Sequence, residues 1–130
     1  GLLNFELNIA CPEGVKPDAK TISWALERNN NIYITHDPQE AAEGANCIIT
    51  DTWRSMGDKS PFLEDQFIPF QVNKNIMELA DKNAIFMHCL PAYRNKEVSS
   101  EVLEGSQSVV FDEAENRLHA QKAIMHFCIK

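Results

Sequence analysis

The sequence predicts an α/β fold in three layers, with a mostly parallel five-stranded sheet and helices on both of its faces. Short apolar runs rich in β-branched residues alternate with longer segments whose apolar residues recur at helical spacing, about five times along the chain. The strand-like runs are apolar almost throughout, which is typical of parallel strands buried on both faces. A length of 130 residues fits one domain.

Each expected strand is followed by a turn or a helix signal. Strands are expected at residues 5–11, 32–35, 47–50, 84–87 and 108–111. Helices are expected at residues 18–28, 38–44, 73–81, 99–103 and 113–129, and residues 51–67 are expected to be irregular. Pro38 and Gly44 fit the start and end of a helix, and Asn73 can cap the next one. This alternation of strand and helix is Rossmann-like.

Composition and charge narrow the class of protein. With 44% hydrophobic residues the chain can build a core, and its net charge of -7 argues against nucleic-acid binding, because a phosphate backbone calls for a basic surface. The four scattered cysteines lack metal-binding spacing, which predicts free thiols in a reducing compartment and no bound metal. Neither a signal peptide nor a membrane-spanning run of ~20 apolar residues is recognisable. A cytoplasmic protein, or one in an organelle matrix, is therefore expected, without membrane association.

The first polar segment at a strand end is the string DTWRSMG, which begins at Asp51. Ligands of parallel sheets bind at the carboxyl ends of the strands, so this segment is a candidate for ligand binding. The Asp51 carboxylate can receive an ammonium group, and Ser55 with nearby backbone N–H groups can receive a carboxylate. The alternative is that Asp51 and Ser55 cap a helical turn while Trp53 packs in the core. Local chemistry alone favours the caps.

The second segment, His88-Cys89-Leu90-Pro91, follows the strand expected at residues 84–87. A cis peptide bond before Pro91 would turn the carbonyl oxygens of Cys89 and Leu90 outward as acceptors for an amine. The alternative, and the commoner situation, is a buried histidine and cysteine beside a structural turn. Neighbours in a strand point to opposite faces, which argues against a direct pair between His88 and Cys89.

The third segment, FDEAENRLHAQKA, leads from the last strand into the last helix. A helix N-terminus favours an anion, and Arg117 adds a permanently charged planar group suited to phosphate or carbonyl oxygen. The alternative is an ordinary surface ion pair between Arg117 and Glu113, four residues earlier, and spacing alone favours that pair.

Taken in order, these segments resemble the transcarbamylase family. The matching strings are DTWRSMG from Asp51, FQVN from Phe70, FMHCLPA from Phe86 and VFDEAENRLHAQKA from Val110, and they cover nearly the whole chain. Long strings do not recur by chance as single short motifs do, so the resemblance outweighs the local alternatives. Ser55-Met56-Gly57 and His88-Cys89-Leu90-Pro91 are similar to the ornithine carbamoyltransferases, rather than to members that use aspartate or putrescine.

The resemblance implies roles for individual residues. Asp51 pairs with the α-ammonium of ornithine, and Ser55 and Met56 hold its α-amino-acid end. Cys89 and Leu90 line the place where the δ-amine meets the carbamoyl carbon, so both contact ornithine and carbamoyl phosphate. Arg117 binds carbamoyl phosphate and counts with Cys89 as catalytic, although Cys89 is not assigned as a nucleophile. A cis bond at Leu90-Pro91 is also a family feature, and neither a metal nor an organic cofactor is needed.

The resemblance further implies carbamoyl transfer from carbamoyl phosphate to the δ-amine of L-ornithine, giving L-citrulline and phosphate in arginine metabolism. Residues 1–130 would be the single ornithine-binding domain, without the N-terminal carbamoyl-phosphate domain, so the chain alone is expected to be inactive. The parent would be a homotrimer or a multiple of trimers. In the family the last helix packs on the other domain, so Met125, Phe127 and Ile129 are expected to be exposed or folded back. Two alternatives stay open: a non-catalytic ornithine-binding module, and a transcarbamylase with another amine acceptor.

Overall fold

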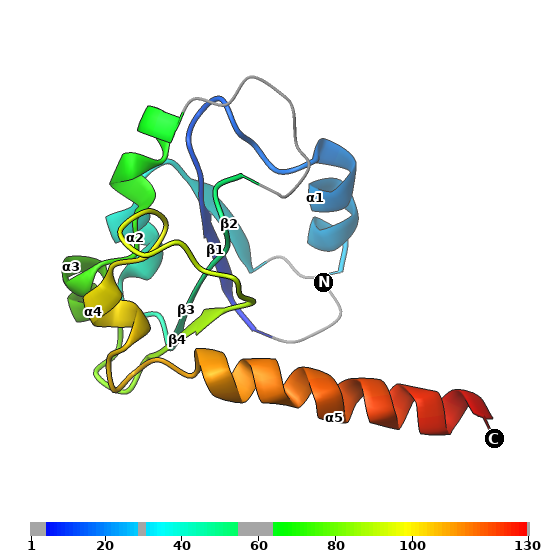
Figure 1. Ribbon diagram of the computed structural model, residues 1–130. Coiled ribbons are helices and arrows are strands. Elements are labelled where there is room, and N and C mark those ends of the chain that lie inside the picture. Colours follow the sequence, from blue (N-terminus) through cyan, green and yellow to red (C-terminus); the bar gives the residue numbers. More distant parts are fainter. Residues whose placement is uncertain (1–4, 29–30, 55–63, 130) are drawn as a thin grey trace.

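Two pairs of parallel strands form the centre of the molecule (Figure 1). The computed structural model describes residues 5–28, 31–54 and 64–129. Strand β1 (Leu7–Ala10) pairs with β2 (Ile32–Thr35), and β3 (Cys47–Thr50) pairs with β4 (Ile85–His88). The α/β class and four of the five predicted strand positions are thus confirmed. Thr50 lies opposite His88 in the second pair, so the residues that follow these two strands leave the sheet side by side.

Short helices connect and cover the strands. They are α1 (Ala19–Leu26), α2 (Pro38–Ala42), α3 (Lys74–Leu79) and α4 (Ser100–Leu103), with 3-10 turns at Glu64–Gln66 and Ile68–Phe70. Each α-helix of this set begins after a side chain that accepts a first-turn backbone N–H: Asp18, Asp37, Asn73 and Ser99 respectively. Figure 1 shows α1 on one side of β1 and β2, and α2, α3 and α4 on the other.

The predicted five-stranded sheet is not confirmed, because residues 108–111 do not form a strand. Ser108 makes a single parallel bridge with Phe86, and the last helix, α5 (Val110–Ile129), begins three residues before its predicted start at Glu113. The peptide groups around Val109 show the change. The Val109 N–H donates to the Phe86 carbonyl oxygen at 3.0 Å, as in a sheet, whereas the Val109 carbonyl accepts the Glu113 N–H at 2.9 Å, as in a helix.

The hydrophobic core lies around β4. Phe86, Val98 and Val110 are almost completely buried, and they pack with residues of α2, α3 and α4. Where the structure describes the chain, α5 joins this core through its first turn, and every residue from 114 to 129 is exposed. Met125, Phe127 and Ile129 are 55%, 81% and 84% exposed, so they do not fold back onto the core. In the part of the chain that the structure describes, no helix is both long and apolar enough to cross a membrane.

Candidate active site

Two of the predicted site residues meet at the carboxyl ends of β3 and β4. Asp51 follows β3 and Cys89 follows β4, and the parallel pairing of these strands places them next to each other. The Cys89 thiol donates a hydrogen bond to Asp51 Oδ1 at a Sγ–Oδ1 distance of 3.2 Å. Both side chains are exposed, so a ligand can reach them.

Asp51 is held as a carboxylate. Its partial burial raises the pKa, but hydrogen bonds from the Cys89 thiol and from the Thr52 N–H outweigh that effect, and the net pKa lies below the ordinary value for aspartate. The Thr52 nitrogen lies 2.7 Å from Asp51 Oδ1. A carboxylate with a lowered pKa remains ionised at neutral pH, and one that is exposed can pair with an ammonium group.

Cys89 is held as a neutral thiol. Its hydrogen bond to Asp51 raises the pKa of the thiol, and burial and the negative charge of Asp51 act in the same direction. Because the thiolate is the reactive form of cysteine, a raised pKa disfavours nucleophilic attack at neutral pH. The geometry therefore fits Cys89 as a hydrogen-bond donor at the end of β4.

The turn that carries Cys89 and Leu90 is fastened to a buried histidine. The peptide bond before Pro91 is cis, which confirms the prediction, and Leu90 has a left-handed backbone conformation with φ 52°. The Leu90 N–H donates to His88 Nδ1 at 2.9 Å, so the ring proton resides on Nε2, which faces Glu97 Oε1 at 3.2 Å. Glu97 Oε1 also accepts the Tyr93 N–H at 2.6 Å. Hydrogen bonds thus hold both ends of this turn.

His88 and Cys89, although adjacent in sequence, differ in burial. His88 is completely buried and Cys89 is exposed, so they face opposite sides as expected of neighbours in a strand. The ligand atoms of Asp51, His88 and Cys89 lie within 4.8 Å of one another, a grouping that could suggest a metal site. Both ring nitrogens of His88 are already engaged, by Leu90 and by Glu97, so this ring has no free nitrogen for an ion.

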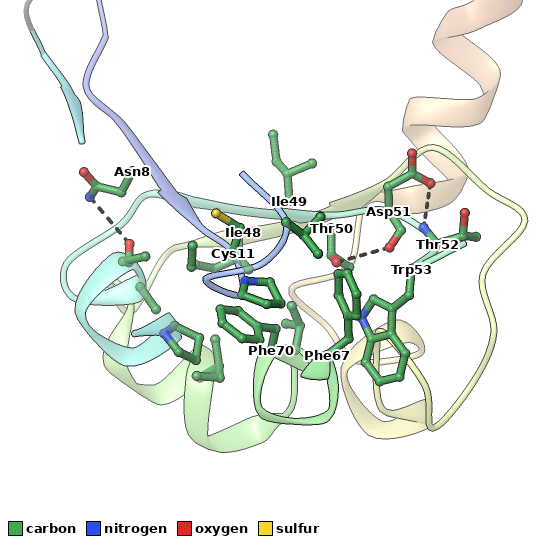
Figure 2. A pocket seen from close by; sticks show the side chains of 18 of the residues that line it. Asn8, Cys11, Ile48, Ile49, Thr50, Asp51, Thr52, Trp53, Phe67 and Phe70 are labelled. Atoms are coloured by element: carbon green, nitrogen blue, oxygen red, sulfur yellow. Dashed lines mark hydrogen bonds between the residues drawn. The ribbon is translucent and has the colours of Figure 1, made fainter. Parts of the chain in front are cut away.

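A cavity of about 330 Å³ opens beside Asp51, between the carboxyl ends of β1 and β3 (Figure 2). Its walls are mostly apolar, and Asp51 and Thr52 lie at its rim. The rings of Trp53 and Phe67 lie against each other in this wall, with centroids 6.0 Å apart. The sequence analysis named Trp53 only as a core residue, in the alternative to ligand binding by this segment, and did not identify Phe67 or Cys11 as lining residues. They come from three distant segments that only the fold brings together.

The remaining predicted site residues are Ser55, Met56 and Arg117. Ser55 and Met56 lie outside the described residues. Arg117 is exposed on α5, one helical turn beyond Glu113. The ion pair considered for Arg117 and Glu113 is not formed among the described residues; instead, Glu113 Oε2 accepts the backbone N–H of His88 at 3.0 Å. Glu97 and Glu113 were not predicted as site residues, because each acts through a contact distant in sequence.

Comparison with known proteins identifies the family of this chain. The sequence model of a family described as "Aspartate/ornithine carbamoyltransferase, Asp/Orn binding domain" matches residues 1–128. The chain belongs to this family. The ornithine carbamoyltransferase of Brucella abortus (strain 2308) is 55% identical over 128 residues, which are 98% of this chain and 41% of that protein. That of Rhodopseudomonas palustris is 53% identical over 126 residues, 96% of this chain and 41% of that protein.

Solved structures of carbamoyltransferases share the fold. Ornithine carbamoyltransferase from Pyrococcus furiosus superposes with a TM-score of 0.85 at 44% identity, over 92% of this chain and 40% of that one. The anabolic enzyme from Campylobacter jejuni gives a TM-score of 0.87 at 37% identity, over 95% of this chain and 42% of that one. The chain therefore spans about two fifths of the length of the carbamoyltransferases it matches.

The hydrogen bond between Asp51 and Cys89 in this carbamoyltransferase domain has a measurable consequence. Replacing Asp51 with alanine is expected to increase the alkylation rate of Cys89 by iodoacetamide severalfold near pH 8. The substitution removes the acceptor and the negative charge that raise the pKa of the thiol. Peptide mass spectrometry can follow Cys89 against Cys128, an exposed cysteine near the end of α5. An unchanged ratio of the two rates would show that Asp51 does not control this thiol.

Proposed function

We propose that the chain is the ornithine-binding domain of an ornithine carbamoyltransferase. This enzyme transfers the carbamoyl group of carbamoyl phosphate to the δ-amine of L-ornithine, giving L-citrulline and phosphate. The observation that carries the proposal is the placement of an ionised Asp51 beside Cys89, at the sheet edge where parallel strands bind ligands. The relatives, which are named ornithine carbamoyltransferases, support the same acceptor.

Ornithine is bound through its α-groups in this proposal. The Asp51 carboxylate receives the α-ammonium, and Ser55 and Met56 hold the α-amino-acid end. Cys89 and Leu90 line the place where the δ-amine approaches the carbamoyl carbon. The exposure of Asp51 and Cys89 and their mutual hydrogen bond support this division of roles, because they set a charged and a neutral group side by side.

The chemistry needs orientation more than an activated protein nucleophile. An alkylammonium has a pKa of about 10, by analogy with lysine, and must lose a proton before it can attack. Fixing the α-groups holds the δ-amine near the carbamoyl carbon, and acceptors around it favour the neutral amine. The new C–N bond forms as the C–O bond to phosphate breaks. Arg117, supplied by α5, binds carbamoyl phosphate and stabilises the negative charge that develops on oxygen.

The remaining parts of the enzyme come from outside this chain. We propose that a carbamoyl-phosphate domain completes the active site, that the enzyme is a homotrimer or a multiple of trimers, and that it acts in the cytoplasm in arginine biosynthesis or the urea cycle. The span of two fifths of the relatives' length supports a two-domain parent. In the complete protein the two strand pairs would belong to one five-stranded, Rossmann-like sheet, whose short fifth strand around Ser108 ends before α5 begins at Val110. The bridge between Phe86 and Ser108 supports that extension.

Carbamoyl transfer by the protein expressed from its complete reading frame tests the proposal. Ornithine would be offered alone and in competition with putrescine, aspartate and N-acetylornithine. Rapid formation of citrulline, with ornithine preferred, is the expected result, and the 130-residue chain alone should be inactive. Transfer to another amine would keep the fold and the mechanism but contradict the acceptor. Ornithine binding without transfer to any amine would favour the non-catalytic binding module.

A further inference from the structure

The backbone N–H of His88 has an unusual partner for a strand residue. On the side of β4 facing residues 107–109, the Phe86 N–H donates to the Gln107 carbonyl at 2.8 Å, and the Val109 N–H donates to the Phe86 carbonyl at 3.0 Å. This is the hydrogen-bond pattern of a parallel ladder. If the ladder continued, the next N–H on this side of β4, that of His88, would donate to the Val109 carbonyl.

A side chain takes the place of that carbonyl. Because α5 begins at Val110, the Val109 carbonyl is engaged by the Glu113 N–H at 2.9 Å. The Glu113 carboxylate turns back, and its Oε2 accepts the His88 N–H at 3.0 Å. The Glu113 N–H thus engages the Val109 carbonyl, and the Glu113 side chain accepts the His88 N–H in its place. A bond from an N–H to a carboxylate is stronger than one between neutral groups.

Among the described residues, this is the last hydrogen bond that joins α5 to the rest of the domain. Glu113 is half-buried, whereas every residue from 114 to 129 is exposed. Figure 1 shows α5 extending away from the strands beyond its first turns. Arg117 is four residues further along, on the same helix face as Glu113 and about 6 Å along the axis. The His88 N–H, at the other end of the bond, directly precedes Cys89.

We propose that Glu113 is a positioning residue, which links the first turn of α5 to the end of β4 and so fixes the direction in which α5 carries Arg117 away from the turn of Cys89 and Leu90. The proposal deepens the function proposed above and rests on it. Glu113 touches neither substrate; it acts through the direction of α5. Since it replaces a missing strand acceptor, the shape and reach of its side chain matter more than its charge.

Four variants of the complete enzyme test this role in steady-state kinetics. Glu113→Ala, which removes the acceptor, should lower kcat/KM for carbamoyl phosphate about tenfold or more, because small misplacements of catalytic groups are costly. Glu113→Asp keeps the charge, but its side chain is too short to reach the His88 N–H, so its kcat/KM should fall as much as that of Glu113→Ala. Glu113→Gln keeps an acceptor oxygen at the same reach and should stay within about threefold of the wild type. Glu115→Ala removes the same charge from an exposed position of α5 and should have little effect.

A double-mutant cycle with Arg117→Ala separates positioning from general damage. If Glu113 acts through Arg117, adding Glu113→Ala to Arg117→Ala should cause little further loss. Additive losses, or a Glu113→Gln variant as impaired as Glu113→Ala, would overturn the proposal.

Hydrogen exchange gives a readout independent of catalysis. The His88 amide should exchange faster in Glu113→Ala than in Glu113→Gln or Glu115→Ala. Unchanged exchange at His88 in Glu113→Ala would show that Glu113 does not hold this amide, and would overturn the proposal. A wild-type protein without carbamoyl transfer would instead contradict the proposed function, while exchange at His88 would still measure the hydrogen bond to Glu113.

Discussion

Replacing Asp51 with alanine is expected to lower kcat/KM for ornithine by about 30- to 1,000-fold in the complete enzyme, since truncating one partner of a close charge pair costs roughly 2–4 kcal/mol. The loss should appear mainly as a higher KM for ornithine, because Asp51 holds the α-ammonium and not the reacting amine. The KM for carbamoyl phosphate should change much less. Initial rates of citrulline formation, with each substrate varied in turn, measure both constants.

The expected loss follows from the state of Asp51 in the unliganded domain. Its lowered pKa keeps the carboxylate ionised at neutral pH, and its exposure leaves it open to an incoming cation. Asp51→Asn, which keeps the shape without the charge, should lose nearly as much as Asp51→Ala. Asp65→Ala removes an exposed carboxylate elsewhere on the surface and serves as the control. An ornithine KM that stays at the wild-type value in Asp51→Ala would contradict the assigned role.

Much of the site could be predicted because strand ends are readable in a sequence. The apolar runs at residues 47–50 and 84–87 marked two parallel strands, and polar residues directly after them must emerge at the same edge. The register of Thr50 with His88 then places Asp51 beside Cys89, as the structure shows. The cis bond before Pro91 was also predicted correctly.

Other parts of the site depend on contacts that no local pattern reveals. The run Ser-Val-Val-Phe at residues 108–111 has strand propensity, yet α5 begins within it, because Glu113 can satisfy the His88 N–H in place of the Val109 carbonyl. The spacing of Glu113 and Arg117 suggested an ion pair, but Glu113 is engaged at His88. Glu97 reaches His88 across an irregular segment of eight residues, and such a pairing cannot be read from periodicity.

The strand that carries the Cys89 turn also carries the core, so its largest buried side chain should dominate the stability of the chain. Phe86 is 0% exposed and packs with the buried Val98 and Val110. Phe86→Ala is expected to lower the free energy of unfolding by about 3–5 kcal/mol, since it removes a large apolar group and leaves a cavity that its neighbours cannot fill. Equilibrium urea unfolding measures this as a lower midpoint with an unchanged slope.

Phe111→Ala is the matched control for this stability prediction. Phe111 follows the buried Val110 on α5 but is 75% exposed, so the same chemical change should alter the free energy of unfolding by less than about 0.5 kcal/mol. Equal losses in the two variants would mean that α5 folds back over Phe111, and that its direction is not set by the first turn alone. A small loss in Phe86→Ala would place the core elsewhere than around β4. A large loss of unfolding free energy in Phe86→Ala alone would show that the core depends on β4, the strand that leads to His88 and Cys89.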